Sequence, residues 1–183
     1  LSGQAIYHRG ANKADTRMSR KGLMDMVSVD MKKLNGLLNR AVIDVITTMT
    51  GFDVEDDPDC SQFAEFESVE TIIGVMAVFG SIDAVVALAT DINSSKLIVA
   101  YMTGIMPTDL TDEDVHDGMA ELVNMLVGRV KADLVREGLD LSITSPFSIS
   151  GTNIEMVFKD RENRICRRFI AGDVEMFLSV AKI

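Results

Sequence analysis

A carboxylate, Glu121, and a carboxamide, Asn124, lie three positions apart in a segment with helical periodicity, and Asp117 precedes Glu121 by four. Residues three and four apart on a helix are neighbours, so these side chains are expected on one face. A carboxylate accepts hydrogen bonds and pairs with cations, whereas a carboxamide donates and accepts without charge. Gly128 leaves a flat area one turn later. The pair could therefore contact a polar partner directly from an exposed helix surface.

The helix that carries these residues is predicted to be amphipathic, with one wide apolar arc opposite the polar residues. The arc comprises Met119, Leu122, Val123, Leu126, Val127, Val130 and Leu134. A polar strip opposite such an arc is typical of any surface helix, so the spacing alone favours a solvated face over a functional site. Thr111 is expected to cap the start of this helix, and Gly138 is expected to end it.

A fourth residue strengthens the functional interpretation. Twenty-one residues separate Asn124 from a proline, so that the sequence reads Asp117-x3-Glu121-x2-Asn124-x21-Pro146. This pattern resembles the signature of the CheC/CheX/FliY chemotaxis phosphatases. A bare Glu-x2-Asn is a weak motif, whereas four residues at the spacing of the family, with similar flanking sequence, are a strong one.

The flanking sequence is most similar to CheX. Residues 110–128 resemble its motif helix, residues 139–146 the strand that follows, and residues 38–49 its opening helix. The resemblance covers about residues 29–183. CheC-like members carry the Glu–Asn pair on both long helices, and CheX-like members carry it on one. Lys32 stands where the first helix here would need Glu, so the resemblance implies one site per chain.

The resemblance implies an enzyme, a protein phosphatase whose substrate is a CheY-like receiver domain phosphorylated on aspartate, in chemotaxis or two-component signalling. An acyl phosphate is already reactive, so catalysis needs mainly an oriented water and charge stabilisation. Asn124 is implied to orient that water, because an amide does not repel the phosphoryl group. Glu121 is implied to pair with the active-site Lys of the receiver. Asp117 and Pro146 match the motif as supporting residues.

Partners and cofactors follow from the same resemblance. The receiver supplies Mg²⁺ as well as its Lys, so this chain is expected to bind no metal and no other cofactor. CheX-like proteins form homodimers through strands of the sheet, and a homodimer is implied here. The alternative is a non-catalytic, CheC-like adaptor module that docks on a receiver domain or on a flagellar switch component. The intact Glu121, Asn124 and Pro146 favour the phosphatase.

The order of the predicted elements indicates an α+β fold. They are a helix at 29–50, strands over 52–89, a helix at 93–103, a helix at 111–136, and strands from 139 onward. This order is a pseudo-repeat of a helix followed by antiparallel strands, which is expected to form two layers with the long helices packed on a β-sheet. Residues 160–163 and 171–173 are expected to be turns of a three-stranded meander. The resemblance implies the CheC-like version of this fold.

Composition limits the classes of partner. The 183 residues include 18 Lys+Arg and 28 Asp+Glu, a formal net charge of −10, which disfavours binding to nucleic acid or anionic membranes. The apolar segment 71–89 approaches the length of a membrane span, but turn residues at 80–83 interrupt it, so two strands joined by a turn are favoured. We therefore expect a cytoplasmic protein without a membrane segment.

Residues 1–28 are expected to form a poorly ordered N-terminal tail, and residues 29–183 are expected to form the phosphatase domain. Cys60 and Cys166 are expected to be reduced thiols rather than a catalytic pair. His116 is expected to be a surface side chain rather than a metal ligand. A basic run is expected to be solvated, although it could contact an acidic receiver surface; it comprises Arg164, Arg167 and Arg168.

Overall fold

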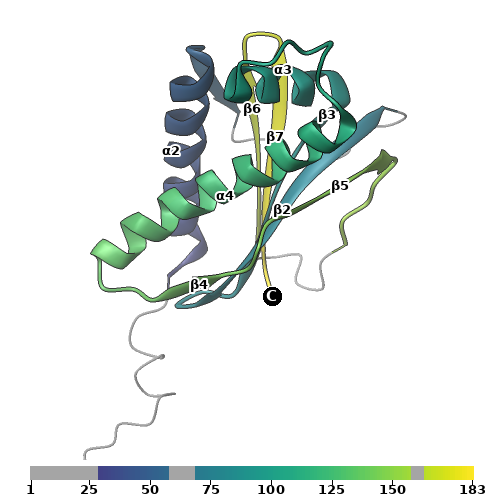
Figure 1. Ribbon diagram of the computed structural model, residues 1–183. Helices are drawn as coiled ribbons and strands as arrows, with labels where there is room; N and C mark the ends of the chain where they lie inside the picture. Colours follow the sequence, from purple (N-terminus) through teal and green to yellow (C-terminus); the bar gives the residue numbers. More distant parts are fainter. Residues whose placement is uncertain (1–28, 58–68, 158–162) are drawn as a thin grey trace, which may run out of the picture.

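The structure, a computed structural model, holds the helices against one face of a β-sheet (Figure 1). It describes residues 29–57, 69–157 and 163–183. The predicted tail 1–28, Cys60 and positions 160–162 of one predicted turn lie outside these ranges. The domain boundary at residue 28 therefore stays a prediction.

The described residues form three helices and a seven-stranded sheet. The helices are α2 (Met31–Thr50), α3 (Ile92–Thr103) and α4 (Asp112–Arg136). The strands are β1 (Val54–Asp57), β2 (Glu70–Gly80), β3 (Ala84–Asp91), β4 (Leu141–Ile143), β5 (Phe147–Thr152), β6 (Arg164–Ala171) and β7 (Val174–Lys182). Every strand pairing is antiparallel. The predicted two-layer α+β fold is confirmed.

The sheet order β1-β6-β7-β3-β2-β4, with β5 also on β2, contains the predicted pseudo-repeat. One half contains α2 and β1 to β3, and the other contains α4 and β4 to β7. The last two strands of each half form a hairpin, and the hairpins meet where β3 pairs with β7. The first strands are exchanged, because β1 pairs with β6 while β4 and β5 pair with β2. This exchange joins the halves in a single sheet.

One predicted strand pairing is wrong. A three-stranded meander would place β5 beside β6, but β5 pairs with β2 instead. The β6–β7 hairpin is present, with residues 172–173 as its turn. Residues 153–163 separate β5 from β6. A connection of that length does not impose a hairpin, so β5 can add to the edge of β2.

Strand β2 is largely buried on both faces. The side chains that face the helices join the main core, and they are Ile72, Met76 and Val78. Those on the opposite face form a smaller apolar cluster with β3 and β7, which comprises Ile73, Val75, Ala87, Ala89 and Phe177. Burial on both faces explains why β2 and β3 read as nearly continuous apolar runs.

The apolar segment 71–89 is a hairpin, as predicted. β2 and β3 pair along almost their full length, and residues 81–83 connect them. None of the helices in the described ranges is both long enough and apolar enough to cross a membrane.

Both ends of α4 are fixed by local hydrogen bonds at the predicted residues. The backbone N–H of Asp114 donates to the Thr111 hydroxyl at 3.1 Å, and the backbone N–H of Thr111 donates to the Asp114 carboxylate at 2.8 Å. Hydrogen bonds from the Thr111 side chain and backbone hold the pKa of Asp114 below its usual value. At the other end, Gly138 has φ 81°, and the N–H of Leu139 donates to the Leu134 carbonyl at 3.1 Å. These caps define where the motif helix starts and stops.

Helix α4 lies directly on β2 at Gly74. A Cβ at this position would lie 2.4 Å from the carbonyl oxygen of Met119. We expect Gly74→Ala to lower the free energy of unfolding by about 1–3 kcal/mol, because the two backbones must move apart. Chemical denaturation measures this change.

A matched control for that variant is Gly36→Ala in α2, where a Cβ would meet no atom within 4 Å. It should instead raise the free energy of unfolding by about 0.5–1 kcal/mol, because alanine restricts the unfolded chain more than glycine does. A Gly74→Ala protein as stable as the wild type would contradict the close approach of α4 to β2.

Candidate functional site

Helix α4 presents three of the four predicted motif residues on its outer face. Every residue of the predicted apolar arc is buried, so the opposite face of α4 is turned toward solvent. Asp117 and Glu121 are exposed there, and Asn124 is half-buried. The helix therefore brings these side chains together on a rigid element.

Glu121 and Asn124 contact each other directly. The Nδ2 of Asn124 donates to the Oε2 of Glu121 at 3.1 Å. Among the described residues, this is the only hydrogen bond of the Asn124 side chain. The carboxylate restrains the rotation of the amide, and the amide oxygen has no partner among the described residues, so it can accept a hydrogen bond from another molecule.

His116 and Asp117, about one turn before this pair on α4, differ in their surroundings. Asp117 makes no hydrogen bond or ion pair within the described ranges. The Nδ1 of His116 lies 2.7 Å from the Oγ of Ser148 in β5. His116 is half-buried on the flank of α4 that packs on β5, so it is less exposed than the sequence suggested and has a defined partner. No group of three or more His, Cys, Asp and Glu side chains in the described part of the chain could hold a metal ion.

Pro146, the fourth motif residue, lies on a different element. It is half-buried in the connection 144–146 between β4 and β5, and both strands contact α4. Figure 1 shows the two strands following each other along α4. Proline is tolerated at a sheet edge because its missing N–H breaks no pairing there. Pro146 thus lies between two strands that contact α4, and it takes no part in the Glu121–Asn124 hydrogen bond.

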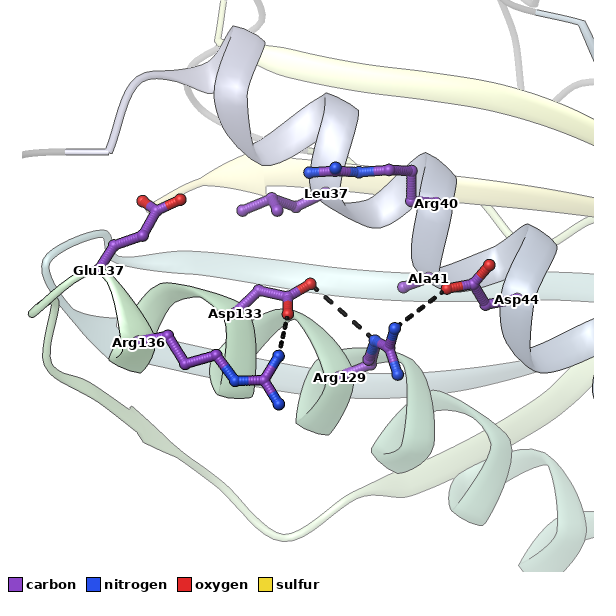
Figure 2. A pocket seen from close by; sticks show the side chains of 8 residues that line it. All are labelled: Leu37, Arg40, Ala41, Asp44, Arg129, Asp133, Arg136 and Glu137. Carbon is purple, nitrogen blue, oxygen red and sulfur yellow. Dashed lines mark hydrogen bonds and ion pairs between the residues drawn. The ribbon is translucent and has the colours of Figure 1, made fainter.

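A groove between α2 and α4 lies beyond the C-terminal side of the motif (Figure 2). It has a volume of about 440 Å³ and is lined by Leu37, Arg40, Ala41, Asp44, Arg129, Asp133, Arg136 and Glu137. An ion pair between Arg129 and Asp44, 3.3 Å long, crosses it from α4 to α2. Glu121 and Asn124 do not line this groove. The candidate site is therefore an exposed helix surface rather than a pocket.

The predicted basic run is not uniformly solvated. The side chain of Arg167 is only 12% exposed and pairs with Asp56 of β1 at 3.1 Å. Its Nη1 also donates to Asn35 of α2 at 3.4 Å. The prediction is wrong for Arg167, because alternation along β6 turns this side chain toward α2 while Arg168 faces the other side. Arg167 therefore joins β1, β6 and α2 at the edge of the sheet distant from α4.

The sequence matches the model of a known protein family. The model of the chemotaxis phosphatase CheX family matches residues 72–169, more than half of the sequence, and this range contains all four motif residues. The chain belongs to the CheX family. Membership confirms the resemblance seen around the motif. A search of curated proteins gave no match.

Solved CheX structures share the fold of this CheX-family chain. CheX from Desulfovibrio desulfuricans is 18% identical with a TM-score of 0.66, covering 82% of this chain and 99% of the other. CheX from Vibrio vulnificus is 18% identical with a TM-score of 0.67, covering 84% and 99%. The CheX–CheY–BeF₃–Mg²⁺ complex from Borrelia burgdorferi gives 17% identity and a TM-score of 0.63, covering 80% and 96%. At these identities the likeness establishes the architecture.

Two structural features beside the CheX motif are not among those predicted from the sequence. The first is the interruption of the edge strand at 144–146. Pro146 is a signal for it, because proline within a strand pattern marks an edge or a bulge. The second is the contact between His116 and Ser148, which joins residues 32 positions apart and has no local signal.

Proposed function

We propose that this CheX-family protein hydrolyses the phosphoaspartate of a CheY-like receiver domain, in chemotaxis or another two-component pathway. The observation that carries the proposal is the hydrogen-bonded pair Glu121–Asn124 on the exposed face of α4. Membership in a family of chemotaxis phosphatases supports the class of reaction. The B. burgdorferi CheX, which was solved with CheY, BeF₃ and Mg²⁺, supports a receiver as the partner.

In this proposal Asn124 orients the attacking water. Positioning and electrostatics dominate the hydrolysis of a reactive acyl phosphate, so no nucleophilic side chain is needed. The amide oxygen accepts a hydrogen bond from the water, and the neutral amide does not repel the phosphoryl oxygens. The contact with Glu121 supports this role, because it restrains the amide before the receiver binds.

Glu121 has a second role in the proposal, which is to pair with the active-site Lys of the receiver. A charge-assisted contact of this kind fixes the docking register more than it adds affinity. Asp117 adds negative charge one turn away and supports Glu121. Pro146 shapes the surface that borders α4.

An exposed helix surface fits a protein substrate better than a small molecule. A small ligand binds in a concave pocket that buries most of its surface, whereas Glu121 and Asn124 lie outside the groove between α2 and α4. A folded receiver carries its own phosphate site, so the helix needs only to reach into it. The receiver brings the Mg²⁺, and this chain contributes no cofactor. A receiver substrate also places the reaction in the cytoplasm.

We further propose a homodimer formed through strands of the sheet, as the family resemblance implies. In the described residues β1 pairs with β6 alone and β5 with β2 alone, so each presents an edge that a second chain can extend. Light scattering on the full chain is expected to give twice the monomer mass. A monomer at every concentration measured would contradict the dimer.

Decay of phosphorylated receiver domains tests the proposed activity. Each receiver from the same organism is phosphorylated, and loss of the phosphoryl group is followed with and without a small amount of this protein. Faster decay of one receiver, with many turnovers per chain, supports the phosphatase. Binding to a receiver without faster decay of any of them would overturn it and favour the adaptor module, which docks on a receiver or a flagellar switch component.

A further inference from the structure

The edge strand beside α4 contains a one-residue bulge. Val78 of β2 pairs with Ile143, and Val75 of β2 pairs with Phe147. Two β2 residues, 76 and 77, lie between these pairs, whereas three residues, 144–146, lie between them on the other strand. An extra residue on one strand is the definition of a β-bulge, and bulges are enriched at sheet edges and next to functional sites.

The bulge decides which side chains of the edge strand face α4. Ile143 packs against the core between sheet and helices, and Ser148 contacts His116 of α4. These two strand residues are five positions apart, so an unbroken strand would turn them to opposite faces of the sheet. The extra residue shifts the alternation by one position, so the side chains of Ile143 and Ser148 both lie on the helix side of the sheet.

Thr144 closes the bulge with two hydrogen bonds to a single β2 residue. Its backbone N–H donates to the carbonyl of Ala77 at 3.0 Å. Its Oγ1 accepts from the backbone N–H of Ala77 at 3.1 Å. The Thr144 hydroxyl thus takes the place of a backbone carbonyl as the acceptor for the N–H of Ala77, which is therefore not left without a partner.

A contact between His116 and Ser148 joins the strand after the bulge to the motif helix. The 2.7 Å contact between His116 and Ser148 is half-buried. His116 directly precedes Asp117 and lies on the flank of α4 rather than on its outer face. Pro146 lies between the two residues that make these contacts, because Thr144 and Ser148 are each two positions from it in the sequence.

We propose that Thr144, His116 and Ser148 are positioning residues of the candidate site. They hold Pro146 and the edge strand at a fixed place beside the face of α4 that carries the Glu–Asn pair. The inference rests on the proposed phosphatase function. None of the three touches the receiver; they act through the placement of the surface that does.

Thr144→Val is the first variant to measure, because it keeps the branched shape and removes the acceptor for the Ala77 N–H. The kcat for receiver dephosphorylation should fall about tenfold while KM stays within about twofold, because small misplacements affect orientation more than docking. Thr144→Ser restores the hydroxyl and should recover most of the wild-type kcat. Thermal unfolding confirms that each variant is folded at the assay temperature.

A double-mutant cycle on His116→Ala and Ser148→Ala provides the second readout, and it decides the matter if Thr144→Val does not fold. The two losses of kcat should not add, because each variant removes the same contact. Additive losses, or an unchanged kcat in Thr144→Val, would overturn the positioning role while the wild type remains an active phosphatase. A wild-type protein that accelerates no receiver would instead overturn the proposed function, and this inference with it.

Discussion

Replacing Asn124 with Ala is expected to slow receiver dephosphorylation by about 100-fold or more at saturating protein, because the attacking water loses the group that orients it. The affinity for a receiver activated with beryllofluoride should change by less than about threefold, since Glu121 and the surrounding surface remain. The only hydrogen bond of the Asn124 side chain among the described residues goes to Glu121, so the fold should not depend on it. Decay of the phosphorylated receiver measures the rate, and titration with the activated receiver measures the affinity.

Lys131→Ala is the matched control for this variant. Lys131 lies on the same side of α4, seven residues and so about two turns after Asn124. Its loss removes a side chain from the helix surface without touching the Glu–Asn contact. A Lys131→Ala protein as slow as Asn124→Ala would contradict a specific role for the amide. An Asn124→Ala protein whose affinity for the activated receiver falls by the same factor as its dephosphorylation rate would also contradict that role.

Glu121→Ala is expected to lower kcat/KM by about 30-fold, with weaker binding and slower turnover together. A hydrogen bond to a charged group is worth about 1.5–3 kcal/mol, and Asn124 also loses the carboxylate that restrains it. Because the proposed contact is between opposite charges, the affinity of the wild type should fall more with added salt than that of the variant. Titrations at two ionic strengths and steady-state rates measure these effects.

Glu121→Gln separates the two roles of this residue. The amide retains an oxygen that can accept from Asn124 but has no charge for the receiver Lys. We expect weaker binding of the activated receiver with a kcat close to that of the wild type. Full activity in Glu121→Ala would remove this residue from the site altogether.

Much of the fold can be predicted because its signals are local. The apolar residues of α4 recur every three or four positions, and that spacing identifies the buried side of a helix without knowledge of what covers it. Thr111 and Gly138 act on hydrogen bonds within a few residues of themselves. The β2–β3 hairpin likewise follows from turn residues between two apolar runs.

The candidate site is predictable along the helix but not across the sheet. Helix geometry alone places Asp117, Glu121 and Asn124 on one face. The position of Pro146 depends on β5 pairing with β2, and that choice depends on which strand edge is available after the whole sheet forms. Arg167 shows the same limit, because alternation along a strand defines two faces but does not say which one a helix will cover.

A crystal structure of this protein bound to its receiver, activated with beryllofluoride and Mg²⁺, tests the proposed function most directly. In this complex we expect α4 to contact the active site of the receiver. The Asn124 amide should lie within hydrogen-bond distance of a water in line with the beryllium, and Glu121 should pair with the receiver Lys. A complex in which α4 stays exposed to solvent, or in which another residue holds that water, would contradict the proposed function.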